Sequence, residues 1–162
     1  MQRSRRHSLM QSSLLDRLLD DDPRSSTEVQ PETHYDVNRY KHAVARDLEA
    51  LLNTRCMVAD GDRLESFQQA GDSLLSFGIT DLSSLSLHDP DDRLFLRDSI
   101  RRTLERHEPR LTKVRVSLDL ARDSARVLKF RVDALLRVHP SRPPVTFDAM
   151  LHLSSNTYQV NR

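Results

Sequence analysis

The sequence predicts an α+β fold in which N-terminal helices pack on a small antiparallel β-sheet. Apolar residues recur every three or four positions in the first two thirds of the chain, which is typical of helices. From about residue 113 they recur at every second position, which is typical of half-buried strands. Helices followed by strands indicate an α+β arrangement. The length of 162 residues allows one domain with a tail. We expect an N-terminal arm over residues 1–33 and a single domain over residues 34–162.

The composition narrows the class of protein. Lys and Arg number 25 and Asp and Glu 24, so the whole molecule is neither a polycation nor a polyanion. With 37% hydrophobic and 30% charged residues, we expect one modest core and a polar surface. Cys56 is the only cysteine, which suits a reducing cytosol. The apolar residues near the start are interrupted, unlike a signal peptide, and no run is long enough to span a membrane.

The predicted arm begins with a short amphipathic helix over residues 9–19. A Ser-, Thr- and Pro-containing linker follows it. One side of the helix is apolar: Leu14, Leu15, Leu18 and Leu19. Such an arm either folds back onto its own domain or docks in a groove on a partner, and the sequence leaves both open.

Two longer helices are predicted in the domain. The first covers about residues 35–54, with a buried face of Val37, Tyr40, Val44, Leu48, Leu51 and Leu52. An irregular connector over residues 57–87 holds all three glycines of the chain. The second helix begins at Asp91 and Asp92 and ends near His107, because Pro109 follows. Its buried side is predicted to contain Leu96, Ile100, Thr103, Leu104 and His107.

The second half of the domain predicts an antiparallel sheet. A strand from about residue 113 points Val114, Val116, Leu118 and Leu120 to one side. After a polar turn at residues 122–125, a second strand does the same with Leu128, Phe130 and Val132. Prolines break the chain before a third strand with Val145, Phe147, Ala149 and Leu151 on one side. A last extended piece is expected over residues 157–160.

The residues offer little support for catalysis. A glycosidase needs a carboxyl group whose pKa is raised, but Glu108 has Arg110 two residues on, and a guanidinium lowers a carboxyl pKa. Asp119, Asp133 and Asp148 fall on the polar side of predicted strands. The seven histidines show no paired helical spacing, and the glycines form no phosphate-binding loop. We therefore expect no catalytic residue, no metal ion and no cofactor.

One stretch of the chain is locally basic. It has three acidic residues, Asp98, Glu105 and Glu108, against seven basic ones: Arg97, Arg101, Arg102, Arg106, Arg110, Lys113 and Arg115. Arg97, Arg101 and Glu105 share one side of the helix, so part of this charge is expected in ordinary surface ion pairs. The stretch contains no Tyr or Trp on which bases could stack. An acidic protein partner therefore fits better than a nucleic acid.

Four segments resemble one family. Residues 46–55, RDLEALLNTR, are similar to a stretch of the TssE family of type VI secretion baseplate proteins. Residues 77–83 resemble the glycine-containing connector of that family, and residues 108–111 resemble its Glu-Pro-Arg motif, which a related phage wedge protein shares. Residues 14–18 are similar more weakly. The chain departs from the family at Thr80, where proline is usual, and at Ala50, where a bulky aromatic residue is common.

The resemblance implies a structural, non-enzymatic subunit of a baseplate wedge at the cytoplasmic face of the inner membrane. Its implied partners are the wedge proteins TssF and TssG, also TssK, and the contractile sheath, whose assembly it would help to initiate. Carried over by motif, Glu108, Pro109 and Arg110 are the partner-binding residues. On the residues alone, an internal clasp between Glu108 and Arg110 explains the same motif.

Two further expectations concern the sheet and the function class. The resemblance implies that the sheet, over residues 114–153, is a template to which sheath subunits add strands through an exposed edge. The alternatives from other classes are a lysozyme-like peptidoglycan glycosidase and a nucleic-acid-binding module that uses the basic helix.

Overall fold

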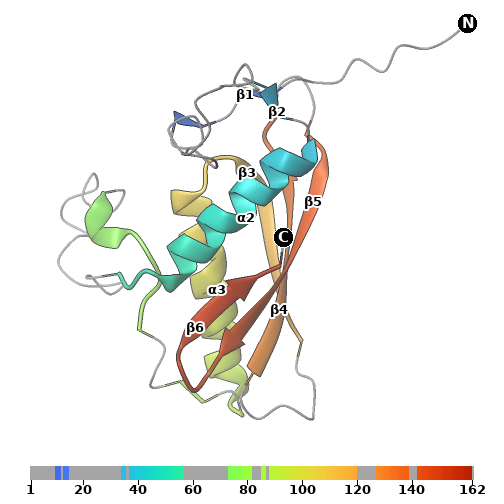
Figure 1. Cartoon of the computed structure of the whole chain (residues 1–162). Coiled ribbons are helices and arrows are strands. Elements are labelled where there is room, and N and C mark those ends of the chain that lie inside the picture. Colours follow the sequence, from blue (N-terminus) through green and yellow to red (C-terminus); the bar gives the residue numbers. More distant parts are fainter. Residues whose placement is uncertain are drawn as a thin grey trace, which may run out of the picture.

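Two long helices lie against one face of a four-stranded antiparallel sheet in the computed structural model (Figure 1), which confirms the predicted α+β class. The structure describes residues 10–11, 13–14, 34–35, 37–56, 73–81, 85–86, 88–119, 127–138 and 142–161. Apolar side chains from both helices and from one face of the sheet form a single core. Within the described ranges, no helix is both long and apolar enough to cross a membrane.

The chain near the N-terminus differs from the prediction. Strand β1 (Met10–Gln11) pairs antiparallel with strand β2 (His34–Tyr35), so the helix expected over residues 9–19 is wrong at Met10 and Gln11. Leu14, on the predicted apolar side, is exposed. Apart from residues 13 and 14, the rest of that helix and the linker lie outside the described residues. The domain boundary at residue 34 stays a prediction.

Helix α2 (Val37–Asn53) confirms the periodic apolar face. Val44, Leu48, Leu51 and Leu52 are buried at spacings of three and four positions, and Ala43 and Ala45 are buried on either side of Val44. The helix begins two residues later than expected because Tyr35 belongs to β2. Val37, expected on the buried face, is exposed in the first turn instead.

Helix α3 (Pro90–His107) begins and ends with sequence-encoded signals. The Asp89 side chain accepts a hydrogen bond from the N–H of Asp91, and Pro90 occupies the first turn, where no N–H is needed. The helix ends at His107, as Pro109 predicts. Leu96, Ile100 and Leu104 are buried as expected. Thr103 and His107 lie at the margin of that face and are half-buried.

The sheet has the order β3-β4-β5-β6, and all neighbours are antiparallel. The strands are β3 (Leu111–Asp119), β4 (Val127–Leu136), β5 (Pro144–His152) and β6 (Thr157–Val160). The predicted alternation is confirmed, except that Leu120 lies outside the described residues. A bulge between Thr112 and Arg115, with Lys113 at φ 55°, places Leu111 and Val114 on the same buried face although they are three residues apart.

The described part of the connector packs tightly on the end of α2. It contains a short 3₁₀ helix, η2 (Leu74–Ser76), and a bridge between Arg55 and Ile79. The N–H of Ile79 donates to the Thr54 carbonyl oxygen at 2.9 Å, and the Cys56 N–H donates to the Ile79 carbonyl oxygen at 3.0 Å. Gly78 adopts φ +108°, and a Cβ there would lie 2.4 Å from the Thr54 oxygen. Only glycine fits at this position.

We expect Gly78→Ala to lower the free energy of unfolding by more than about 2 kcal/mol, because it adds both backbone strain and a clash with a backbone oxygen. Urea unfolding followed by circular dichroism would measure the loss. The exposed Ser117→Ala serves as control and should change stability by less than about 0.5 kcal/mol. A Gly78→Ala protein as stable as wild type would contradict this account of the connector.

Candidate functional site at the corner between α3 and β3

Residues 108–110 form the corner at which the chain passes from α3 into the sheet. The N–H of Glu108 donates to the Leu104 carbonyl oxygen at 2.9 Å and closes the last turn of the helix. The N–H of Leu111 then donates to the Glu108 carbonyl oxygen at 3.1 Å. Pro109 sits exposed between them and fixes one backbone dihedral angle. The corner is therefore stiff.

The Glu108 carboxylate is almost fully buried, with 4% of the residue exposed, and Arg110 engages both of its oxygens. Arg110 Nε donates to Glu108 Oε1 at 2.7 Å, and Arg110 Nη2 donates to Oε2 at 2.5 Å. The backbone N–H of Arg110 also donates to Oε1, at 3.1 Å. The sequence allowed two explanations of this motif, an internal clasp between Glu108 and Arg110 or a contact with a partner. The structure contains the internal clasp.

Asp47 of α2 completes the network. Arg110 Nη2 donates to Asp47 Oδ2 at 2.8 Å, while Arg46 Nη2 donates to Asp47 Oδ1 at 2.8 Å. Two acids and two bases thus join α2, the end of α3 and the start of β3. Sequence analysis missed this role of Asp47, because the 63 positions between Asp47 and Arg110 leave no local pattern. The one signal was that Asp47 lies within the family-like stretch 46–55.

The environment keeps Arg110 charged. Burial lowers the pKa of its guanidinium, but the hydrogen bonds and charges of Glu108, and then of Asp47, outweigh burial and raise that pKa above its ordinary value. The side chain is still 21% exposed. Its Nη1 atom makes no hydrogen bond to another residue that the structure describes. One edge of the guanidinium therefore stays accessible.

The remaining candidate residues are placed separately from this corner. Asp119, Asp133 and Asp148 lie on the solvent side of the sheet, as expected; Arg131 pairs with Asp148 at 2.8 Å and Thr146 donates to Asp133 at 2.7 Å. On α3, Arg101 pairs with Glu105 at 3.0 Å, which confirms an ordinary surface ion pair. Across the described segments, no three His, Cys, Asp or Glu side chains gather as metal ligands would.

The end of α2 holds the last strand of the sheet through side chains. Tyr158 N–H donates to Asn53 Oδ1 at 2.8 Å, and Asn53 Nδ2 donates back to the Tyr158 carbonyl oxygen at 2.8 Å. Val160 N–H donates to Glu49 Oε2 at 3.0 Å, and Arg55 Nη2 donates to the Asn156 carbonyl oxygen at 2.7 Å. The polar residues of the family-like stretch therefore serve the fold.

The fold and the corner define a class of protein: a small α+β domain whose helix-to-strand corner is held by ion pairs. The family model described as "Baseplate wedge protein gp25" matches residues 38–141. That match covers more than half of the chain, and the chain belongs to this family.

Comparison with individual proteins adds less. None of the curated proteins matches the chain. One similar solved structure is "The baseplate complex from the type VI secretion system", with 15% sequence identity and a TM-score of 0.49. The match covers 68% of this chain and 93% of the chain in that structure.

We expect Arg110→Ala to destabilise the domain by about 2–3 kcal/mol, because it leaves the buried Glu108 carboxylate without its cation. The double variant Glu108→Met, Arg110→Met removes both charges and should recover most of that loss. Asp47 is not left unpaired, because it still accepts a hydrogen bond from Arg46. Thermal unfolding of the three proteins measures the difference. If the double variant were less stable than Arg110→Ala, the assigned role of the clasp would be wrong.

Proposed function

We propose that the chain is a structural, non-enzymatic subunit of a type VI secretion baseplate wedge, and that the corner at residues 108–110 contacts the wedge proteins. The observation that carries the proposal is the four-residue charge network at the corner. It fixes α2, α3 and β3 together and leaves Pro109 and one edge of Arg110 facing outward. Membership of a baseplate wedge family supports the same role.

The internal clasp and the partner contact are compatible on this proposal. Glu108 is a positioning residue, because its buried carboxylate orients the guanidinium of Arg110. Arg110 Nη1 then offers its N–H groups to an acceptor on the partner, such as a carboxylate or a backbone carbonyl oxygen. Since the proline and the clasp already hold the corner in one conformation, little conformational entropy is lost on binding.

The geometry argues against the lysozyme-like alternative. A glycosidase acid must carry a proton near neutral pH and must reach the glycosidic oxygen. Both oxygens of Glu108 are instead engaged by a guanidinium that stays charged, inside a nearly buried corner. We therefore expect no muramidase activity from the purified chain.

The proposed partners are TssF and TssG at the corner, with TssK in the same assembly and the contractile sheath at the β-sheet. The assembly would lie at the cytoplasmic face of the inner membrane. The chain has a modest core and a polar corner held in one conformation. These features are consistent with a small subunit that binds between larger subunits.

The corner is tested by co-purification with TssF and TssG. We expect the double variant Glu108→Met, Arg110→Met to lower their recovery at least tenfold, because the oriented guanidinium is gone while no buried charge is left unpaired. Arg131→Met, Asp148→Met is the matched control, since it removes an equivalent but exposed ion pair on the far face of the sheet. Equal recovery with both double variants would exclude the corner as the contact.

Addition of sheath strands to this sheet, as the resemblance implies, would use a free edge, and the two edges differ. At β6 the outward backbone groups of Tyr158 and the N–H of Val160 are bonded to side chains of α2. A new strand cannot bond there without displacing them. Truncation of the C-terminus is no clean test, because it removes Tyr158 and Val160 from the core.

The other edge is β3. Along an antiparallel strand, successive residues point their N–H and C=O groups toward opposite neighbouring strands. The N–H of Tyr158 points outward, and this determines which residues of the paired strands also point their N–H groups outward. Tyr158 lies opposite Leu151, and the pairings continue from there across β4 to β3. These pairings make the N–H groups of Val116 and Leu118 point away from the sheet. No other described segment makes a backbone hydrogen bond to these two residues. We therefore propose β3 as the edge at which the first sheath strands add.

We expect Leu118→Pro to reduce sheath nucleation severely, because proline removes an N–H that faces the incoming strand but leaves the bonds to β4 intact. Leu118→Ala is the matched control: it loses the same side chain and keeps the N–H. Counting fluorescent sheaths in cells that carry each variant measures the effect. Normal sheath number with Leu118→Pro would show that β3 is not the edge used.

A further inference from the structure

The guanidinium of Arg110 keeps two N–H groups for a partner, and both belong to Nη1. A guanidinium carries five N–H donors in a fixed plane. Nε and one N–H of Nη2 donate to the two oxygens of Glu108, and the other N–H of Nη2 donates to Asp47 Oδ2. The donors of Nη1 have no acceptor among the residues that the structure describes. A partner that binds this side chain therefore meets Nη1.

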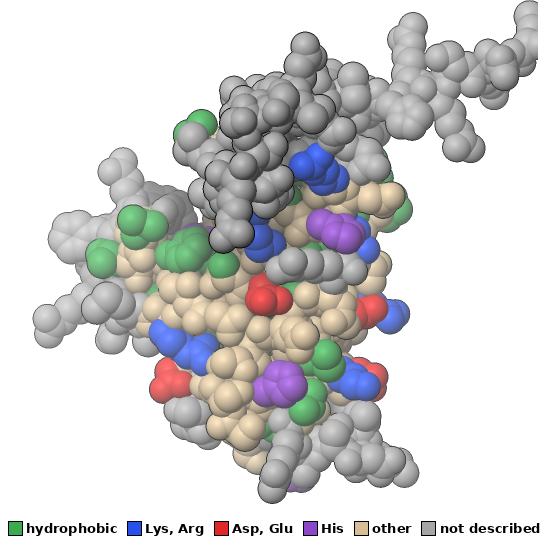
Figure 2. Space-filling model, in the orientation of Figure 1, with side chains coloured by type: hydrophobic (Ala, Val, Ile, Leu, Met, Phe, Trp, Pro, Cys, Tyr) green, Lys and Arg blue, Asp and Glu red, His purple; other side chains and the backbone are tan. Residues whose placement is uncertain are grey.

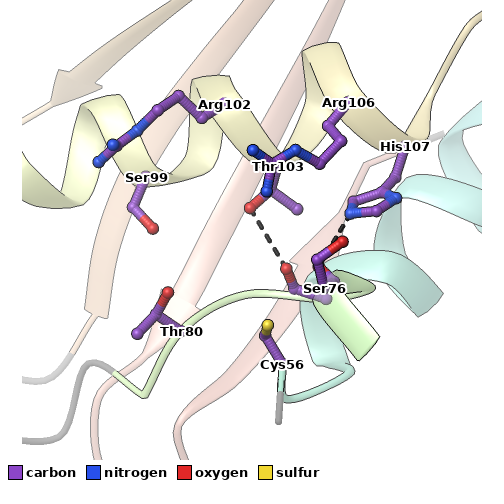
Figure 3. A pocket seen from close by; sticks show the side chains of 9 residues that line it. Cys56, Ser76, Thr80, Ser99, Arg102, Thr103, Arg106 and His107 are labelled. Carbon is purple, nitrogen blue, oxygen red and sulfur yellow. Dashed lines mark hydrogen bonds between the residues drawn. The ribbon is translucent and has the colours of Figure 1, made fainter. Parts of the chain in front are cut away.

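The helix end that leads into the corner is fixed on its other side by the connector. His107 Nε2 lies 2.8 Å from the Ser76 carbonyl oxygen, and Thr103 Oγ1 donates to the Gly78 carbonyl oxygen at 3.3 Å. In Figure 3 both side chains point from α3 toward the connector. The Phe77 ring packs edge-on against His107, with the ring centres 5.3 Å apart. The corner is therefore presented to a partner from a fixed helix end.

The charges at the corner disfavour a partner carboxylate. Two acids and two bases meet there, so the corner is neutral overall. Acceptors on neighbouring nitrogens of one guanidinium lie only a few ångströms apart, and like charges at such a distance repel. A carboxylate at Nη1 of Arg110 would lie beside the carboxylate of Asp47, whose side chain is 29% exposed. An uncharged acceptor meets no such repulsion.

The charge balance of the chain gives little long-range attraction for an acidic partner. The sequence has 25 basic and 24 acidic residues. On the described part of the face in Figure 2, basic and acidic side chains are interspersed. A mixed surface of this kind does not steer a charged partner. The sequence favoured an acidic partner for the basic stretch that contains Arg110, but the ion pairs of Arg110 remove its charge from that balance.

Main-chain carbonyl oxygens match the two N–H groups of Nη1. A carbonyl oxygen has two lone pairs and accepts hydrogen bonds without a net charge. Carbonyl oxygens that lack a partner within their own chain occur at the C-terminal ends of helices. Pro109 is exposed beside the guanidinium and is a rigid, apolar neighbour for such a segment.

We infer that Asp47 is a specificity-determining residue of the corner, which restricts the acceptor at Nη1 of Arg110 to main-chain carbonyl oxygens of a partner protein. Asp47 Oδ2 holds Nη2 and so orients Nη1, and the charge of Asp47 disfavours a carboxylate at the same place. Asp47 is a positioning residue, because it acts through Arg110. The inference rests on the proposed function, since it names the chemistry of the partner at the same corner.

The first test measures the affinity of Asp47→Asn for purified TssF and TssG. The amide keeps the shape of the side chain and removes its charge. We expect affinity at least about fivefold lower, because Nη1 loses its orientation. Glu49→Gln is the matched control: it makes the same charge change on α2 at a residue that bonds to Val160, and it should stay within about twofold of wild type. A partner carboxylate would instead bind Asp47→Asn more tightly. Any result in which Asp47→Asn binds no more weakly than the control overturns the inference.

A double-mutant comparison separates positioning from a general structural role of Asp47. In the background Glu108→Met, Arg110→Met there is no guanidinium to orient, so adding Asp47→Asn should change affinity by less than about twofold. A general structural role would lower affinity by the same factor in both backgrounds, and that result would contradict the inference. Circular dichroism at the assay temperature checks that every variant is folded.

Ionic strength distinguishes a charged from an uncharged acceptor. Glu108→Met, Arg110→Met leaves the net charge of the chain unchanged, so its loss of affinity reports the corner contact. With carbonyl oxygens as acceptors, this loss should agree within about twofold at about 50 mM and about 500 mM NaCl. A loss that shrinks by more than about fivefold at the higher salt concentration would indicate a partner carboxylate and overturn the inference.

A structure of the wild-type chain bound to TssF and TssG shows the acceptor directly. We expect a main-chain carbonyl oxygen about 3 Å from Arg110 Nη1. A carboxylate in that place would overturn the inference and leave the proposed corner contact intact. A complex in which the corner touches no partner would remove both the inference and the corner contact. If wild type binds neither protein, the proposed function fails and the inference with it.

Discussion

The guanidinium of Arg110 is the group at which both helices and the start of the sheet are joined by side chains. It bonds to Glu108 at the end of α3 and to Asp47 in the middle of α2, and it directly precedes Leu111, the first residue of β3. Its opposing carboxylate is buried, so the ion pair cannot be exchanged for water without leaving a charge in the core. One side chain therefore joins both helices and the beginning of the first strand at the corner.

The stretch over residues 46–55 connects the remaining parts. Asp47 faces the corner, whereas Glu49 and Asn53 bond to β6. Further along, the Thr54 carbonyl oxygen accepts from the connector, so close to Gly78 that no side chain fits there. The segment that resembles a known family thus contacts the corner, the last strand and the connector. Its polar residues hold the fold together.

The helices and strands could be predicted from the sequence because each depends on local signals. The long-range contacts could not be predicted, because no local pattern encodes them. The alternation of Val145, Phe147 and Ala149 predicts a strand because every second side chain must reach the core. Pro109 predicts the end of α3 by steric restriction of the preceding residue. In contrast, the partner of Arg110 in α2 and the pairing of Met10 with Tyr35 depend on tertiary structure. Repeating apolar residues also predicted a helix at Met10, where backbone pairing with a distant segment prevailed.

The last turn of α3 links the connector and the corner through adjacent residues. His107 lies against the Ser76 carbonyl oxygen of the connector, and Glu108 orients Arg110 at the corner. Both residues sit on a helix end closed by the hydrogen bond from the Glu108 N–H to the Leu104 carbonyl oxygen. A shift of this turn would disturb both contacts at once, because a close-packed interior transmits strain. The position of the connector and the orientation of Arg110 therefore depend on the same turn of α3.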